Sequence, residues 1–257
     1  MPELLVEQNN HICTLTLNRP QKRNSLTPQI LEQLVETFDR LGREGETRVA
    51  IIRGAGEEAF SSGFDIGQID ENTGSKQGNH VSGPAGAIVN APFPVIAMVH
   101  GFCMGLGLEI ATSCDLRFAS ESARFAMPPA KLGLVYQPDG FLRFVNLIGV
   151  AHTKEMFFRG RLIPSSRALE IGLVSYVLPA EELSKFTYDV AEEIAQNAPL
   201  SVSGTKEVIN RALRFQQLSE QDRASVEELI RRAVHSEDVK EGQKAFFEKR
   251  KPVFKGR

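Results

Sequence analysis

Tryptophan is absent from this 257-residue sequence, and cysteine is scarce, with three residues. Cys13, Cys103 and Cys114 are odd in number, none belongs to a CxxC pair, and each has apolar or small neighbours. Disulfide frameworks and zinc sites need paired cysteines at regular spacing, so we expect three buried free thiols in a reducing compartment. The five histidines show no ligand spacing either, and the sequence predicts no metal site.

Two further features are missing, a long apolar run and an excess of one charge. No run approaches the roughly 18 residues of a membrane-spanning helix, and no secretory signal pattern begins the sequence. The net charge is −2, whereas binders of nucleic acid or membrane surfaces concentrate Lys and Arg. We therefore expect a cytoplasmic protein with no nucleic-acid or membrane partner. The basic run 249–257 is a solvated tail unless it has a ligand.

Several short segments have the pattern of β-strands. Residues 4–8 and 11–18 predict two strands joined by the turn pair Asn9-Asn10. Continuous apolar runs of this length are typical of strands that are buried on both faces. Such runs occur at residues 49–54, 94–101, 115–120 and 172–179.

Helix signals lie between the strands and dominate the end of the sequence. Thr27 and Pro28 match the cap and first position of a helix that continues with apolar residues at helical spacing. The stretch 67–94 is rich in Gly, Ser and Asn and predicts a long loop, functional or mobile. Four amphipathic helices are predicted at 181–198, 201–215, 219–236 and 236–250. Mixed elements followed by helices alone indicate an α/β core with a C-terminal helical region.

Two glycine-containing segments could bind an anionic oxygen. AFSSGFDI (59–66) and HGFCMGLGLEIA (100–111) each place glycine next to a strand-like run, the second as a tight Gly101-to-Gly107 connection with a helix from Leu108. Unpaired N–H groups at a helix start can hold an anion, and two such loops would form an oxyanion hole. The alternative is a pair of glycine turns that only permit close packing.

Glu109 is the one carboxylate within the apolar start of that predicted helix. Burial would raise its pKa and suit it to act as an acid or base. The alternative is a core carboxylate paired with a group such as His100 or Arg117.

From end to end, the chain resembles the crotonase (enoyl-CoA hydratase/isomerase) superfamily. The resemblance rests on five segments in order, at residues 17–27, 56–66, 94–120, 160–179 and 245–254. It implies a spiral of ββα turns in two stacked sheets, with residues 1–190 as the core and acyl-CoA site. Residues 191–257 would form a helical oligomerisation region, and the assembly would be a homotrimer or a dimer of trimers.

The same resemblance implies a coenzyme A thioester as substrate, with coenzyme A as part of it and no separate cofactor. The backbone N–H groups of Phe64 and Leu106 would hold the thioester oxygen. The family usually has a small residue at the first of these positions and a glycine at the second. The larger side chains of Phe64 and Leu106 should therefore narrow the acyl pocket. Positions assigned to substrate and CoA binding are Lys22, Arg23, Ser62, Asp65, Ile66, Tyr136, Phe246 and Lys249. Phe246 and Lys249 match positions that often serve a neighbouring subunit, which gives the basic tail a ligand.

The family pattern breaks at the second catalytic acid. Hydratases of this family use two glutamates, and Glu109 matches the first, but Pro129 stands at the second position. Another acid position of the family falls on Gln137, which cannot transfer a proton. Asp139 follows two residues later, within a Pro-Asp-Gly sequence that also suits a turn or helix cap.

Three catalytic arrangements therefore remain open. Glu109 acts alone, or Asp139 or Tyr136 replaces the missing group, or proton transfer is secondary to enolate stabilisation, as in decarboxylation. We expect a hydratase/isomerase-type enzyme, a lyase first and an isomerase next, with Glu109 and then Asp139 as catalytic residues. The alternatives are an acyl-CoA decarboxylase or hydrolase, or a non-catalytic acyl-CoA-binding relative. A serine peptidase using Ser62 or Ser113 is a further alternative without a recognisable His and Asp.

Overall fold

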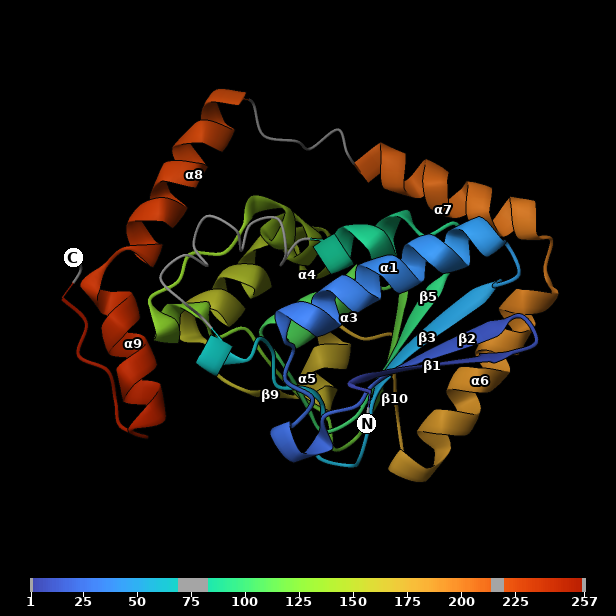
Figure 1. Cartoon of the computed structure of the whole chain (residues 1–257), viewed down its shortest axis with the longest axis horizontal. Coiled ribbons are helices and arrows are strands. Elements are labelled where there is room, and N and C mark those ends of the chain that lie inside the picture. Colours follow the sequence, from blue (N-terminus) through green and yellow to red (C-terminus); the bar gives the residue numbers. More distant parts are fainter. Residues whose placement is uncertain (1, 69–82, 214–219, 256–257) are drawn as a thin grey trace.

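The computed structural model describes residues 2–68, 83–213 and 220–255, with two sheets at its centre (Figure 1). The larger sheet has the order β1-β2-β3-β5-β7-β10. It consists of β1 (Leu4–Asn9), β2 (Ile12–Leu17), β3 (Val49–Gly54), β5 (Val95–Val99), β7 (Leu116–Ser120) and β10 (Tyr176–Leu178). The smaller sheet, β4-β6-β8-β9, consists of β4 (Ala59–Ser61), β6 (Phe102–Met104), β8 (Arg124–Ala126) and β9 (Ile163–Pro164).

From β3 to β8, consecutive strands alternate between the two sheets. Strands β3, β5 and β7 pair in parallel in the larger sheet, and the strand after each of them, β4, β6 or β8, pairs in parallel in the smaller one. Helical segments then follow: residues 83–90 after β4, α3 (Leu106–Ser113) after β6, and η3 (Pro129–Leu132) with α4 (Pro138–Arg159) after β8. This repeated ββα turn confirms the predicted α/β spiral core.

The remaining helices surround this core (Figure 1). They are η1 (Pro20–Lys22), α1 (Pro28–Glu44), η2 (Ile66–Gln68), α5 (Ser165–Glu170), α6 (Ala180–Gln196), α7 (Pro199–Leu213), α8 (Glu220–Val234) and α9 (Glu237–Phe247). Helices α6 and α7 lie at one end of the molecule, whereas α8 and α9 lie at the other end, beyond α4. The C-terminal helical region is therefore spread over both ends of the core.

Both faces of the larger sheet are buried, as its continuous apolar strands predict. In β3, Ala50 and Ile52 pack into the main core with α1 and α3, whereas Val49 and Ile51 pack into a second core. The second core is closed by residues of α6, including Leu183, Ala191 and Ala195. The period-2 alternation of a strand thus supplies both cores from one run of sequence.

Local signals at the N-terminus are confirmed. Asn10 has φ +51°, the left-handed conformation that a tight turn between β1 and β2 requires. The Thr27 hydroxyl accepts a hydrogen bond from Ile30 N at 3.2 Å, and Pro28 is the first residue of α1. The Ser236 hydroxyl caps α9 in the same way through Val239 N.

Two predicted boundaries are wrong. Only Tyr176–Leu178 of the predicted strand 172–179 is extended, because Gly172 turns at φ +77° and the Leu173 amide bonds back to Ala168 O. The predicted loop 67–94 contains a helix at residues 83–90, which buries Ala85 and Ile88. Its residues 69–82 lie outside the described part of the chain.

A third boundary differs next to the glycine-rich segment. The tight connection from Gly101 to Gly107 contains strand β6, and α3 begins at Leu106 rather than Leu108. A strand can form here because Phe102–Met104 pairs with Arg124–Ala126 of β8, a partner that no local pattern reveals. The proposed division at residue 190 falls inside α6, and Ala191 and Ala195 are buried beyond it.

Two further findings concern the cysteines and the hydrophobicity of the helices. The three cysteines are free and buried. No helix within the described ranges is long and apolar enough to cross a membrane.

Candidate active site

One cavity of about 860 Å³ collects most of the predicted site residues. Its wall is formed by the loop after β4, the start of α3, the segment from η3 to α4, and α9. Ten of the twelve predicted residues line it: Arg23, Ser62, Phe64, Asp65, Ile66, Leu106, Glu109, Tyr136, Asp139 and Phe246. Lys22 and Lys249 do not, and both are exposed.

The two predicted oxyanion loops approach each other directly. A Cβ on Gly63 would lie 2.9 Å from Met104 O and 3.4 Å from Leu106 N, so only glycine permits this contact. Gly63 also has φ +97°. The two segments are therefore locked together at the point where Phe64 and Leu106 enter the cavity wall.

The amides of Phe64 and Leu106 are free of the local backbone ladder. Phe64 forms a parallel bridge with Leu26 whose two bonds use Gly63 O and Asp65 N, so the Phe64 N–H points away from Leu26. Leu106 is the first residue of α3, where an N–H has no intrahelical acceptor. Two donors in one cavity wall can stabilise a developing oxyanion.

Asp65 is held by buried protein groups. Its Oδ2 accepts from Arg19 Nη1 at 3.0 Å and from the Ser25 hydroxyl at 3.4 Å, while its amide donates to Leu26 O. Arg19 also pairs with Glu3 at 3.0 Å. These contacts fix the residue that follows Phe64, so Asp65 tethers the Phe64 loop.

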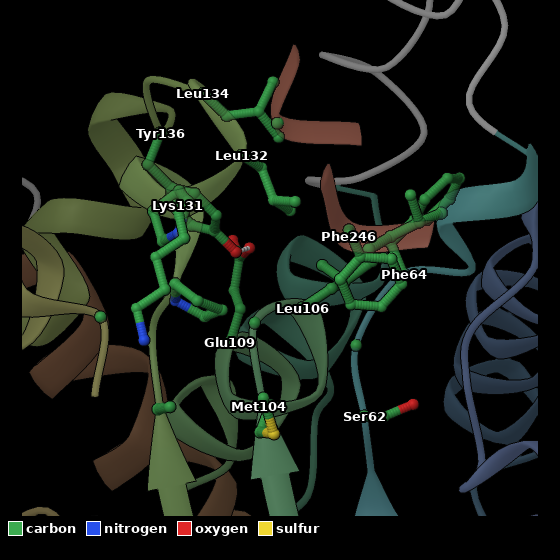
Figure 2. A pocket seen from close by; sticks show the side chains of 18 of the residues that line it. Ser62, Phe64, Met104, Leu106, Glu109, Lys131, Leu132, Leu134, Tyr136 and Phe246 are labelled. Carbon is green, nitrogen blue, oxygen red and sulfur yellow. Dashed lines mark hydrogen bonds between the residues drawn. The ribbon is translucent and has the colours of Figure 1, made fainter. Parts of the chain in front are cut away.

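Glu109 lies in the first turn of α3 and is 2% exposed. Tyr136 donates its hydroxyl proton to Oε2, and Arg143 pairs with Oε1 through Nη2. In Figure 2, the Glu109 side chain points toward Tyr136, whereas Phe64, Leu106 and Phe246 gather on the other side of the cavity. The carboxylate therefore pairs with Arg143, and the alternative pairing with His100 or Arg117 is wrong.

Ionisation at this site is shaped by burial and by three neighbours. Burial raises the pKa of Glu109, the Arg143 guanidinium and the Tyr136 hydroxyl partly oppose the increase, and Asp139 adds to it. Burial and the adjacent Glu109 charge raise the pKa of Tyr136 well above its ordinary value. Tyr136 therefore keeps its proton while Glu109 is the group that changes charge.

The position of the missing acid lies in the same wall. Pro129 opens η3 and is buried, and Gln137 is the cap residue of α4. Asp139 lines the cavity and lies in the first turn of α4, so the Pro-Asp-Gly sequence starts a helix rather than forming a free turn. Asp139 is the second carboxylate that the described wall brings near Glu109.

Three of the residues predicted to contact CoA, Arg23, Ser62 and Phe246, come from different parts of the cavity wall. Arg23 pairs with Glu58 at 3.0 Å, and its guanidinium lies 5.6 Å from the ring centre of Phe102. Figure 2 places Ser62 well away from Glu109, on the same side of the cavity as Phe64. Phe246 enters the cavity of its own chain from α9.

Arg143 is the site residue that sequence reasoning missed. It lies one turn into α4 in the segment FLRFVNLIG, which has no catalytic motif. Arg143 lies seven residues after Tyr136. This spacing is informative only in the folded chain, where both side chains bond to Glu109. Within the described ranges, no group of three or more His, Cys, Asp or Glu could hold a metal ion.

Comparison with known proteins gives full-length matches. The family model described as enoyl-CoA hydratase/isomerase matches residues 7–257. A short-chain-enoyl-CoA hydratase of Clostridium acetobutylicum is 33% identical, covering 96% of this chain and 95% of the relative. A carnitinyl-CoA dehydratase of Salmonella typhi is 36% identical, covering 99% and 98%.

Solved structures of two kinds are similar. A methylmalonyl-CoA decarboxylase in complex with 2-nitronate-propionyl-CoA has a TM-score of 0.93 at 29% identity, covering 100% of this chain and 99% of the other. An enoyl-CoA hydratase from Bacillus anthracis has a TM-score of 0.79 at 32% identity, covering 100% of both chains. The predicted family resemblance is confirmed, and the chain arrangement is more similar to that decarboxylase structure.

Proposed function

Because the chain belongs to the enoyl-CoA hydratase/isomerase family, we propose that it binds an acyl-CoA thioester in the cavity and acts as a hydratase or dehydratase, a lyase. The observation that carries this proposal is the burial of Glu109 in the same cavity wall as the Phe64 and Leu106 amides. A carboxylate is placed beside two oxyanion donors, which is the arrangement needed to make and consume an enolate.

The proposed mechanism begins at the thioester oxygen. The N–H groups of Phe64 and Leu106 hold that oxygen, so that negative charge built up by water addition to the β-carbon is delocalised onto it. Ionised Glu109 takes the proton from the attacking water. Protonated Glu109, or the carboxyl group of Asp139, then donates a proton to the α-carbon to complete the addition. Dehydration follows the reverse path. Coenzyme A enters as part of the substrate and no separate cofactor takes part.

Asp139 is the proposed second acid–base group. It comes from α4 rather than from the position of Pro129, and it lines the cavity opposite α3. An Asp139→Asn variant tests this role, because the amide keeps the size of the side chain and removes its titration. Two-group catalysis predicts a loss of about 10²-fold or more in kcat, whereas unchanged turnover would leave Glu109 to act alone.

Decarboxylation is the second candidate. It is favoured by the engagement of both Glu109 oxygens by Tyr136 and Arg143, by Pro129 at the usual acid position, and by the TM-score of 0.93 to a methylmalonyl-CoA decarboxylase. Loss of CO2 leaves its electron pair in the enolate, so the two amide donors supply the main stabilisation. A proton then returns to the α-carbon.

One experiment separates these reactions. The protein is incubated with enoyl-, 3-hydroxyacyl- and malonyl-type CoA thioesters, and the products are measured by mass spectrometry. A product heavier or lighter by one water supports the lyase, and loss of CO2 supports the decarboxylase. An unchanged mass with altered absorbance identifies an isomerase. Binding of the thioesters without turnover would contradict both proposals and leave a non-catalytic acyl-CoA-binding protein.

Assembly and location are further parts of the proposal. We propose a homotrimer or dimer of trimers in the cytoplasm, with residues 191–257 in the contacts. Exposed Leu200, Val208 and Ile209 on α7 support an apolar contact, and the three buried free thiols support a reducing compartment. Light scattering after size-exclusion chromatography tests the assembly, and a monomeric mass at working concentration would contradict it.

A further inference from the structure

We propose that Arg143 is a positioning residue, which holds the Glu109 carboxylate ionised and fixed in orientation so that it serves as the base of the site. This inference rests on the proposed function, because it concerns the group assigned to proton transfer. The Arg143 role is not part of the family pattern in the sequence, and it follows from three features of the structure.

The first feature is that two residues of one segment, Tyr136 and Arg143, bind both oxygens of the Glu109 carboxylate. Tyr136 lies two residues before α4 and Arg143 lies within it, and the two side chains bond to different oxygens of Glu109. Tyr136 is itself fixed by aromatic packing, with ring centres 5.5 Å from Phe157 and 6.1 Å from Phe141. Each carboxylate oxygen has room for a second hydrogen bond, so these two bonds leave acceptor positions for a substrate proton or water.

The second feature is that Arg143 is poorly placed to stabilise the fold. Its Nε is buried and has no hydrogen-bond partner in the described part of the chain, which costs free energy. Buried Arg117 is different, because its Nε donates to Leu173 O at 2.8 Å and its Nη1 to Cys114 O at 2.6 Å. Arg117 ties backbone segments together, whereas the Arg143 guanidinium contacts the Glu109 carboxylate.

The third feature is the balance of charges around Glu109. Arg143 is the positive group in direct contact with the carboxylate, and Asp139 on the same helix contributes an opposing negative charge. Tyr136 faces it as a neutral donor. Lys131 of η3 and Arg250, after α9, line the same cavity, and Arg250 is paired with Glu241 at 2.5 Å. Burial disfavours a charged carboxylate, so removal of Arg143 leaves Glu109 protonated over a wider pH range.

The test is a direct titration of Glu109. Protein labelled with ¹³C at the glutamate side-chain carboxyl is titrated by NMR, and the Glu109 signal is identified by its loss in Glu109→Gln. Arg143→Gln is expected to raise the titration midpoint by about one pH unit or more. Arg143→Lys, which keeps a positive charge but replaces the planar guanidinium with an ammonium group, is expected to raise it less. The matched control is Arg159→Gln, an exposed arginine farther along α4 paired with Glu155, which leaves the midpoint unchanged.

Kinetics give a second, independent readout. In Arg143→Gln, the acidic limb of kcat against pH moves upward with the NMR midpoint, and activity recovers at higher pH. A merely structural role would lower kcat equally at all pH values. An unchanged NMR midpoint in Arg143→Gln would overturn the proposal.

The control for folding is Arg143→Met, whose side chain fills similar space but carries no charge. If neither the Gln nor the Met variant folds, Arg143 has a structural role and the proposal fails. The NMR measurement needs no substrate. Absence of turnover with every thioester, together with a raised midpoint, would therefore reject the proposed function while leaving the coupling between Arg143 and Glu109 in place.

Discussion

Two of the buried ion pairs in the described part of the chain differ in character. Lys206 of α7 is buried, and its Nζ donates to Ile88 O at 3.0 Å, Phe93 O at 2.9 Å and Asp115 Oδ2 at 2.7 Å. All three ammonium protons are used, and Asp115 Oδ2 also accepts from Val95 N at 2.7 Å. The Arg143–Glu109 pair instead borders the cavity and leaves Arg143 Nε without a partner among the described residues.

This difference separates a structural pair from one suited to chemistry. A fully satisfied buried pair holds its elements in register, and removal of one partner strands the other charge. An incompletely satisfied pair beside a cavity contributes less to folding but keeps a carboxylate ready for an incoming group. Burial alone does not distinguish the two cases, whereas the hydrogen-bond partners do.

The largest effect is expected from Glu109→Gln, which alters the ion pair beside the cavity. Its amide fills the same space, but it cannot exchange a proton, so kcat should fall by about 10²–10⁴-fold. The amide oxygen can still accept from Arg143, and the Arg143 side chain is partly exposed at the cavity, so the free energy of unfolding should change little. The checks are steady-state kinetics and urea unfolding on the same preparation. Full activity in this variant would show that Glu109 is not catalytic.

The reciprocal change is Lys206→Met, on the other pair. It strands the Asp115 carboxylate and two backbone carbonyls. The free energy of unfolding should therefore fall by about 3 kcal/mol, at the low end of the range for buried pairs because Asp115 is partly exposed. Turnover in folded protein should stay close to the wild-type value. Urea unfolding measures the loss, and Lys206→Met with Asp115→Asn should recover part of it. Stability equal to wild type would remove the structural role.

A third change leaves both pairs intact and moves one wall of the cavity. A Cβ on Gly242 of α9 would lie 2.8–2.9 Å from the backbone of Leu132 in η3. Gly242→Ala should therefore displace α9, raise KM, and cost about 1–3 kcal/mol. Gly204→Ala is the matched control, since no atom lies within 4 Å of its Cβ position in α7, and it should stabilise by up to about 1 kcal/mol. Equal behaviour of the two variants would mean that α9 is not part of the wall.

The smallest effect concerns stability against pH. The pKa of Glu109 is raised above its ordinary value of 4.5, so the folded chain keeps this proton after the unfolded chain has lost it. The contribution of Glu109 to stability is thus fully present below pH 4.5 and declines as the pH rises through the folded pKa. Subtracting the Glu109→Gln unfolding curve from the wild-type curve isolates this slope. A difference that increases with pH would contradict the raised pKa.

The sequence predicts local elements well where local chemistry determines them. The turn at Asn10 and the cap at Thr27 each depend on neighbouring residues, and both are confirmed. Strand β6 was missed because three residues form it only by pairing with β4 and β8. The helix at 83–90 was missed because Gly and Ser suggested a loop, whereas Ala85 and Ile88 are stabilised there by the core.

The candidate site shows the same division. The family resemblance placed Glu109, Phe64 and Leu106 in one cavity, since ordered motifs carry that information. It did not find Arg143, and the residues alone had offered His100 or Arg117 as the partner of Glu109. Partner choice depends on the direction in which α4 leaves the loop after η3, and no single residue pattern encodes that direction.

Phe246 enters the cavity of the chain that also supplies Glu109. Among the described residues, helices α3 and α9 of one and the same chain thus supply both side chains to the cavity. Two defective alleles, one altered at Glu109 and the other at Phe246, should not complement each other when expressed together. When either variant is instead expressed together with the unaltered chain, activity should follow the fraction of unaltered chains.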